Sequence, residues 1–357
     1  MKMKKQVILI LGIILFNVCL FAQKNTLVLM HPTAYNLELF TSLLNKKIID
    51  LRNITIVGVY HEKETYDYSE SAQFLEENNY ANITLRKVAE DIEPNKLYQE
   101  NECSYIYRDI FQKSVGIIFF GGPDLPPAIY GESMSLLTRM TDPYRLYFEA
   151  SFMFHLLGGS QNEASVPLLE ENPSYTVYAI CLGMQTMNIA TGGSMVQDIP
   201  SELYDLKTVE EVLALENNKQ HRNYNNNLTI VSTLFPGNFH QIKITNQKPL
   251  AGDDCKNLSP LIYSNHHQAI EKLGKNLMSI ANSMDGKIIE AIVHEKYPNV
   301  LGIQFHPEGK SLHDPEIKYR KNLKDDLTSG IEILKENQSY QFHIEFWETF
   351  TGKIKSN

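Results

Sequence analysis

Residues 178–185 read YAICLGMQ, and they continue the apolar, β-rich run Tyr175–Ile180. Small residues lie two positions before and after Cys181, at Ala179 and Gly183, and a helical pattern follows. A strand that turns sharply into a helix needs small neighbours, because the turn brings backbone segments together. The pattern predicts a nucleophile elbow that presents Cys181 at a helix N-terminus, where the dipole favours the thiolate. A buried structural cysteine is the alternative, since most free cysteines are of that kind.

The chain before this elbow alternates between predicted strands and helices. Strands are predicted at Thr26–Met30, Ile54–Tyr60, Ile83–Val88 and Val115–Phe120, and helices around Leu37–Leu44, Tyr105–Gln112 and Leu146–Leu157. A β-α-β-α-β order of this kind is typical of a doubly wound parallel sheet.

The second half reads differently. Strands are predicted at Leu228–Leu234, Phe239–Thr245, Leu277–Ala281, Lys287–Val293 and Val300–Phe305, and a closing helix at Leu323–Phe350. Asp285-Gly286 is a hairpin signal, which indicates antiparallel additions. We therefore predict an α/β fold: a three-layer, doubly wound, mostly parallel, flavodoxin-like sheet with antiparallel additions in the second half.

A second chemical signal follows the run Val300–Phe305, where His306 and Glu308 flank Pro307. In open α/β sheets, ligands bind at the carboxyl ends of the strands. A cysteine nucleophile needs an imidazole to move its proton, and the imidazole needs a third group to orient it. This predicts a triad of Cys181, His306 and Glu308. A surface tripeptide is the alternative, because so short a motif is weak by itself.

A third signal is the pair Gly121-Gly122, which directly follows the strand Val115–Phe120. Glycines there let the backbone turn with its N–H groups exposed. With the N–H of Leu182, such groups would form an oxyanion hole. A plain βα turn is the alternative. The three signals end three separate strands, and their joint occurrence favours the functional interpretation.

These residues resemble the class I glutamine amidotransferase superfamily, and within it the gamma-glutamyl-gamma-aminobutyrate hydrolase branch of the gamma-glutamyl hydrolases. The matching motifs are Gly121-Gly122-Pro123-Asp124, Ala128-Ile129-Tyr130-Gly131-Glu132, Ile180–Gln185 with Asn188, Gly192-Gly193-Ser194, Gln197-Asp198, His266-His267-Gln268, Asp285-Gly286 with Ile289-Glu290-Ala291, and Leu301–Glu308. The resemblance implies the class I glutamine amidotransferase fold and a Cys–His–Glu triad that cleaves a gamma-glutamyl amide through a thioester.

The same resemblance implies that Gln185 helps to hold the glutamyl group and that His266 or His267 contacts substrate. Either histidine could instead satisfy buried polar groups near the pocket. Ala179, Pro126 and Asn265 stand where the family usually has Gly, Asp and an aromatic residue. The last two departures lie near the expected substrate mouth and bear on the acceptor side of the substrate.

The N-terminus predicts export. Lys2, Lys4 and Lys5 precede the apolar run Val7–Phe16, and Ala22 precedes a polar residue, which is the pattern of a signal peptide. We expect cleavage near Ala22, so that residues 1–22 form the signal and residues 23–357 a single glutamine amidotransferase-like hydrolase domain, periplasmic or secreted. A membrane anchor is the alternative, but the apolar stretch is short for a span.

Composition narrows the function classes further. The net charge is −9 without a cluster of Lys and Arg beyond the N-terminus, which argues against nucleic-acid binding. After signal removal Cys103, Cys181 and Cys255 remain, and pairing of Cys103 with Cys255 stays open. No metal or other cofactor is predicted, because metal spacings such as C-x-x-C are absent.

Three functions are compatible with this pattern: an exported gamma-glutamyl hydrolase, a glutaminase subunit that delivers ammonia to a synthetase, and a non-catalytic binding protein on the same fold. The export signal favours the hydrolase, because such synthetases generally need ATP and a cytosolic setting. The expected partner is a small gamma-glutamyl substrate, with a homodimer as a possible assembly.

Overall fold

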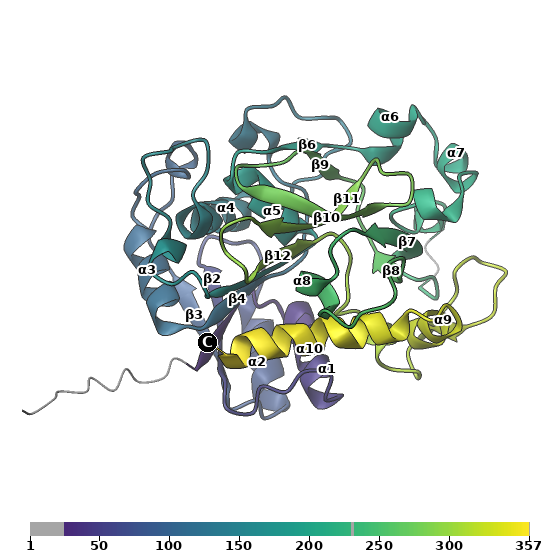
Figure 1. The fold of residues 1–357 in the computed structure, drawn as a ribbon, viewed down its shortest axis with the longest axis horizontal. Coiled ribbons are helices and arrows are strands. Elements are labelled where there is room, and N and C mark those ends of the chain that lie inside the picture. Colours follow the sequence, from purple (N-terminus) through teal and green to yellow (C-terminus); the bar gives the residue numbers. More distant parts are fainter. Residues whose placement is uncertain (1–24, 230–231, 357) are drawn as a thin grey trace, which may run out of the picture.

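The computed structural model of the protein describes residues 25–229 and 232–356. The predicted signal peptide, residues 1–22, lies outside the described residues. Ten strands form one central sheet in the order β3-β2-β1-β4-β5-β12-β11-β10-β7-β8 (Figure 1). The first six are parallel, and the last four are added antiparallel. This confirms the predicted fold class, including the antiparallel additions.

The parallel strands are β1 (Thr26–Met30), β2 (Thr55–His61), β3 (Ile83–Val88), β4 (Gly116–Phe119), β5 (Thr176–Ile180) and β12 (Val300–Ile303). The antiparallel strands are β7 (Asn238–Ile244), β8 (Leu261–Ser264), β10 (Leu277–Ser283) and β11 (Ile289–His294). Every residue of β4, β5 and β12 is buried, because helices cover both faces of the parallel half.

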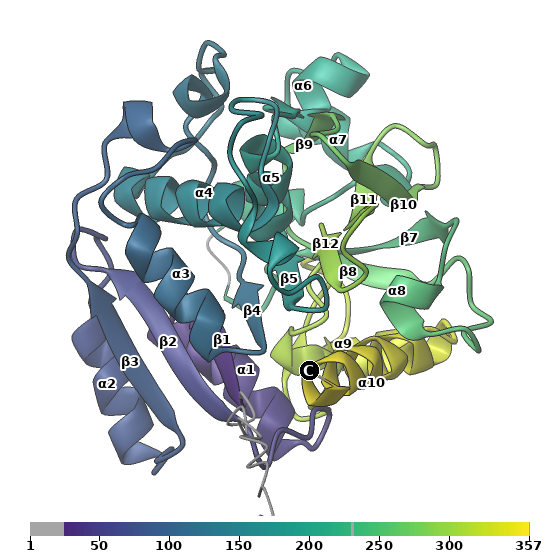
Figure 2. The same ribbon diagram turned by 60° about the vertical axis from the view of Figure 1, so that its left-hand side comes forward.

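Two layers of helices cover the sheet (Figure 2). On one face lie α1 (Ala34–Asn45), α2 (Tyr68–Glu77) and α10 (Tyr340–Ser356), whose Phe40, Leu75 and Trp347 join one hydrophobic cluster. On the other face lie α3 (Ser104–Lys113), α4 (Pro143–Leu157) and α5 (Leu182–Ala190), whose Phe111, Phe152 and Met184 join another. The sheet is thus the middle layer between two apolar cores.

Shorter elements complete the second half. They are the helices α6 (Ile199–Tyr204), α7 (Val209–Leu213), α8 (Lys248–Ala251) and α9 (Gly330–Glu336), and the strand pairs β6 (Ser194–Val196) with β9 (Ala269–Lys272) and β13 (Lys318–Tyr319) with β14 (Thr328–Ser329). The predicted Asp285-Gly286 hairpin joins β10 to β11.

Two predicted elements are wrong. Where a strand was expected at Leu228–Leu234, the described residues form turns, with Leu228 exposed and a single bridge from Leu234 to Arg320. A β-prone run forms a strand only beside a neighbour it can pair with, and the described residues of this run pair at that one bridge alone.

The predicted helix Leu323–Phe350 is two helices, α9 and α10. The capping box of Ser329 with Glu332 starts the first helix at Gly330, and residues 323–329 are not helical. A break at Asn337–Ser339, where Gln338 has a φ of 53°, separates the two. Within residues 25–229 and 232–356, no helix is long and apolar enough to cross a membrane.

Candidate active site

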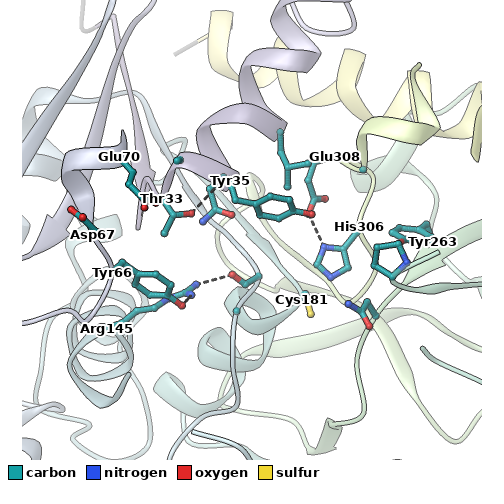
Figure 3. A pocket seen from close by; sticks show the side chains of 18 residues that line it. Thr33, Tyr35, Tyr66, Asp67, Glu70, Arg145, Cys181, Tyr263, His306 and Glu308 are labelled. Atoms are coloured by element: carbon teal, nitrogen blue, oxygen red, sulfur yellow. Dashed lines mark hydrogen bonds and ion pairs between the residues drawn. The ribbon is translucent and has the colours of Figure 1, made fainter. Parts of the chain in front are cut away.

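The three predicted chemical signals meet at one edge of the sheet. β4, β5 and β12 are neighbours and run parallel, so their carboxyl ends place the glycine pair, Cys181 and His306 side by side. Gly121, Gly122, Cys181, His306 and Glu308 all line a cleft with a volume of about 480 Å³ (Figure 3). The predicted triad therefore shares one open cavity.

Cys181 is at a strained turn between β5 and α5. Its φ of 53° and ψ of −107° put a non-glycine residue in a rarely populated conformation, as a nucleophile elbow requires. Gly183 makes the turn possible, because a Cβ there would lie 2.6 Å from the carbonyl oxygen of Phe119. The sulfur is at the N-terminus of α5, where the helix dipole favours a thiolate.

His306 pairs with Glu308 as predicted. Its Nδ1 lies 2.6 Å from Oε1 of Glu308, so Nδ1 carries the hydrogen. Burial lowers the pKa of His306, but the negative charges of Glu308 and Cys181 raise it further, and the pKa ends well above its ordinary value. The same environment holds a thiolate–imidazolium pair together.

Three contacts fix the His306–Glu308 segment. The backbone N–H of His306 donates to the carbonyl oxygen of Tyr263 on β8, at 2.8 Å. The indole of Trp347 on α10 and the imidazole of His313 both reach the carbonyl oxygen of Pro307, at 3.2 and 2.8 Å. The antiparallel half and the last helix thus position the base.

The glycine pair is held by a residue that the sequence did not single out. Nη2 of Arg145 on α4 donates to the carbonyl oxygens of Gly121, at 2.8 Å, and Phe120, at 3.3 Å. A Cβ on Gly122 would lie 2.2 Å from the Arg145 guanidinium, so only glycine fits there. Because C=O and N–H of a trans peptide point in opposite directions, this anchor turns the Gly122 N–H away from Arg145. The orientation agrees with the predicted oxyanion role of Gly121, Gly122 and Leu182.

Gln304, also without an assigned role, touches the nucleophile. Its Nε2 lies 3.5 Å from Sγ of Cys181. Gln185, predicted to hold the glutamyl group, is buried and does not line the cleft; its Nε2 donates to Oε1 of Gln304 at 3.2 Å and to the carbonyl oxygen of Gln268 at 3.4 Å. In this structure Gln185 orients Gln304, and its substrate contact stays a prediction.

The two predicted substrate histidines lie behind the cleft rather than in its lining. His267 bridges Asp124 and Asp198, with 3.0 Å contacts to each carboxylate, and so ties the glycine loop to α6. His266 is buried, and its Nδ1 lies 2.8 Å from the carbonyl oxygen of Gln268. The structure assigns both a part in the framework, and their contact with substrate remains untested.

The other two cysteines, Cys103 and Cys255, are free thiols that do not line the cleft. Cys103 lies 3.3 Å from the carbonyl oxygen of Glu90, and Cys255 lies 3.7 Å from that of Asn257. Burial raises the pKa of Cys103 to about 11. Neither thiol pairs with the other, so the open question of a disulfide between them is resolved against it.

The rest of the cleft comes from the N-terminal part of the chain, where the sequence offered no motif. Thr33, Tyr35, Tyr66, Asp67 and Glu70 line it. Figure 3 shows Asp67 and Glu70 on the side away from Cys181 and His306. Both acids are exposed, so this side of the cleft is negative.

The chain matches a known protein family. The model of the family described as Peptidase C26 matches residues 56–308, which is more than half of the chain. The match contains the glycine pair, Cys181, His306 and Glu308.

Individual proteins give the same picture. The chain is 30% identical to "Putative glutamine amidotransferase-like protein YvdE" of Lactococcus lactis over 54% of this chain and 65% of that protein. It is 31% identical to "Putative glutamine amidotransferase Rv2859c" of Mycobacterium tuberculosis over 56% of this chain and 51% of that protein. It is 26% identical to "Gamma-glutamyl-gamma-aminobutyrate hydrolase" of Escherichia coli O157:H7 over 58% of this chain and 68% of that protein. The chain thus spans about half to two thirds of the length of these relatives.

Proposed function

Because the chain belongs to the Peptidase C26 family, we propose that it is a cysteine hydrolase that cleaves gamma-glutamyl amide or peptide bonds through a thioester on Cys181. One observation carries the proposal. The strained Cys181 elbow and the His306–Glu308 pair line the same open cleft, at the ends of two neighbouring parallel strands.

Acylation follows from this arrangement. The Cys181 sulfur attacks the amide carbon, and its proton resides on Nε2 of His306, since Nδ1 is engaged by Glu308. The N–H groups of Gly122 and Leu182 stabilise the oxyanion. His306 then protonates the leaving amine as the C–N bond breaks, which leaves a glutamyl thioester on Cys181.

Deacylation uses the same base. His306 takes a proton from water, the hydroxide attacks the thioester carbon, and the C–S bond breaks to release glutamate and restore the thiolate. Glu308 stabilises the imidazolium in both halves of the reaction, because it is buried beside Nδ1.

The polarity of the cleft suggests which substrates fit. Asp67 and Glu70 make the side away from Cys181 negative, so a substrate with a positive group at that end is favoured over one with a carboxylate. Arg145 does not cancel this charge, because it lies 4.0 Å from the buried carboxylate of Glu149 and donates to backbone carbonyls.

The test is release of free glutamate from gamma-glutamyl compounds with neutral, cationic and anionic leaving amines. We expect Cys181→Ala to lower kcat by about 10³-fold or more, since it removes the nucleophile. Cys255→Ala is the matched control, because it removes a free thiol outside the cleft, and it should keep wild-type activity. Unchanged activity in Cys181→Ala would refute the assignment.

A second function is favoured by the names of the relatives, two of which are called glutamine amidotransferases. A glutaminase subunit would use the same triad but release ammonia from glutamine to a synthetase. Glutaminase activity that appears only with a partner protein would favour this alternative. Trapping a glutamyl thioester on Cys181 would exclude a non-catalytic binding protein.

We also propose export, on the basis of Lys2, Lys4 and Lys5 before the apolar run Val7–Phe16. The mass of the protein recovered from its native host tests this. A chain that begins near Gln23 supports cleavage after Ala22, and an intact N-terminus contradicts it.

A further inference from the structure

Three histidines and one glutamate meet in the antiparallel half of the sheet, behind the cleft. They are His221, His240, His266 and Glu290, called here the His240 cluster, and all four are buried. One candidate ligand atom from each lies within 4.8 Å of the other three. The ring of His221 packs against those of His240 and His266, with centroids 4.4 and 5.0 Å away.

Six of the eight side-chain nitrogen and oxygen atoms of this cluster lack hydrogen-bond partners. Both ring nitrogens of His221, Nε2 of His240, Nε2 of His266 and both carboxylate oxygens of Glu290 are buried and unsatisfied. Buried polar groups are almost always hydrogen-bonded, so several orphaned atoms that face one another need an explanation.

In His266 and His240, the partner of Nδ1 determines whether Nε2 carries a hydrogen or a lone pair. Nδ1 of His266 lies 2.8 Å from the carbonyl oxygen of Gln268, and Nδ1 of His240 lies 3.3 Å from that of Gln241. A carbonyl oxygen only accepts, so each Nδ1 carries the hydrogen, and each neutral ring presents a lone pair at Nε2.

Lone pairs and a carboxylate therefore point at a common centre. Neither Nε2 of His240 nor Nε2 of His266 can donate to Glu290. Nδ1 of His221 is the remaining ring nitrogen near the carboxylate, at 3.2 Å from Oε1, and the lone pairs of the other two rings stay without a donor. A cation at the centre would satisfy them, because neutral imidazole nitrogens and a carboxylate oxygen are metal ligands. A carbonyl bound to the distal ring nitrogen is the usual support of a metal-binding histidine.

The spacing agrees with a small divalent cation. Oε1 of Glu290 lies 3.2 Å from Nδ1 of His221 and 3.7 Å from Nε2 of His240. Tetrahedral zinc with ligands at about 2.0–2.1 Å separates its ligand atoms by about 3.3 Å. Because the four ligand atoms lie within 4.8 Å of one another, side-chain shifts on the order of 1 Å close the shell.

We propose that the His240 cluster is a structural zinc site, with three imidazoles and one carboxylate as its ligands. Four protein ligands leave no open position, and the site is sealed from solvent, which is typical of structural rather than catalytic zinc. The ion would link four segments: the loop before residue 224, β7, the segment after β8, and β11. Of these, β7 and β11 both pair with β10 but not with each other.

The site lies behind the nucleophile. The carbonyl oxygen of Gln268 accepts from both His266 and Gln185, and Gln185 donates to Gln304, which touches Cys181. The ion would thus hold the framework that orients Gln304. This inference is independent of the proposed function, since it concerns metal binding and not the reaction.

The decisive experiment is cobalt titration of the full wild-type chain after removal of bound metal with a chelator. We expect one Co²⁺ per chain, the intense visible absorption of tetrahedral cobalt, and its loss when Zn²⁺ is added. A spectrum identical to that of the free aqua ion would overturn the proposal, and it needs no variant to do so.

Variants then locate the site. Glu290→Gln and His240→Asn should each weaken Zn²⁺ binding by more than about 100-fold, since even supporting residues of metal sites contribute 10–100-fold. His155→Asn is the matched control, because His155 is also buried but lies on α4, outside the cluster. Elemental analysis should find one zinc in the wild type and the control, and circular dichroism checks that each variant is folded. Equal zinc in folded Glu290→Gln would overturn the assignment of ligands.

Discussion

The parallel half and the antiparallel half of the sheet each bury histidines against glutamates, but they do so in opposite ways. In the parallel half, the His31 cluster consists of His31, Glu64, Arg145 and Glu149. Nδ1 of His31 lies 2.9 Å from Glu64 and Nε2 lies 3.0 Å from Glu149, so both nitrogens carry a hydrogen. Arg145 lies 4.0 Å from Glu149. Two cations and two anions balance in charge, although Nε2 of His31 and both carboxylate oxygens of Glu149 meet only as ion-pair contacts and not as well-aligned hydrogen bonds.

In the antiparallel half, the His240 cluster has three imidazoles and one carboxylate. Two of its rings present lone pairs toward the carboxylate, because their hydrogens are engaged by backbone carbonyls. The difference teaches that burial of histidine with glutamate has no single meaning. The second nitrogen of each ring decides whether the first faces the centre as a donor or as a ligand.

The largest expected effect comes from replacing Arg145, because this cation both balances the charge of the His31 cluster and anchors the glycine pair. Arg145→Met leaves His31 as the single cation beside the buried carboxylates of Glu64 and Glu149, and it frees the carbonyls of Phe120 and Gly121. We expect a loss of about 3–5 kcal/mol in the free energy of unfolding, measured with urea, because a buried charge loses its partner. We also expect a fall in kcat, because the glycine pair loses its anchor.

The control for this prediction is Arg86→Met. Arg86 is paired with Asp109 at 2.8 Å, but both side chains are about one third exposed. Its loss should cost no more than about 1 kcal/mol, as for most surface ion pairs. Equal costs for the two variants would mean that the His31 cluster does not depend on its charge balance.

A smaller effect should follow from metal removal, and only in the other half. With zinc at 100 to 1,000 times its Kd, its loss should lower the free energy of unfolding by about 2.7–4 kcal/mol. Thermal unfolding with and without chelator measures this. The difference should vanish in Glu290→Gln and persist in His31→Gln, since only the first variant lacks a ligand. If the chelator still lowers the free energy of unfolding of Glu290→Gln, the stabilising metal is not in the His240 cluster, and the proposed difference between the two halves of the sheet is wrong.

The smallest effect is a pH dependence. Burial lowers the pKa of His31, but Glu64 and Glu149 raise it more, so the pKa is above its ordinary value of 6.5. The folded state then holds the proton more tightly than the unfolded state, and the stabilisation is complete below pH 6.5 and is lost as pH rises through the folded pKa. The stability gap between wild type and His31→Gln should shrink above pH 6.5, by at most about 1.4 kcal/mol per pH unit.

His155 provides a control of opposite sign. Burial lowers its pKa below 6.5, so its unfolded state binds the proton more tightly. The gap between wild type and His155→Gln should shrink as pH falls below 6.5. Urea unfolding at several pH values measures both gaps, and slopes of the same sign would contradict the charge states assigned here.

The sequence was enough to identify those site residues that lie close together in the chain at the end of a single strand. Cys181 was found because its small neighbours and the following helix are local, and His306 with Glu308 because only Pro307 separates them. Gln304 and Arg145 were missed as site residues. Gln304 lies within the predicted strand Val300–Phe305 and looks like part of it. Arg145 directly precedes the predicted helix Leu146–Leu157, and no pattern marks it as buried.

The antiparallel half shows the same limit more sharply. Leu228–Leu234 has the composition of a strand, but its described residues pair only at the bridge from Leu234 to Arg320, whereas Leu261–Ser264 and Ala269–Lys272 are strands that the sequence did not reveal. Pairing decides which short β-prone runs become strands, and pairing is a property of the assembled sheet.

The amino-acid sequence alone determined the order of strands and helices in the first half, the elbow at Cys181 and the pairing of His306 with Glu308, because each depends on residues a few positions apart. Only the tertiary structure decided that Arg145 anchors the glycine pair and that His221, His240, His266 and Glu290 converge. His240 lies two residues before Ile242, the residue that pairs with the end of β10 at Ser283, and there the side chains of β7 and β11 can meet. That meeting depends on strand register, which no local spacing encodes.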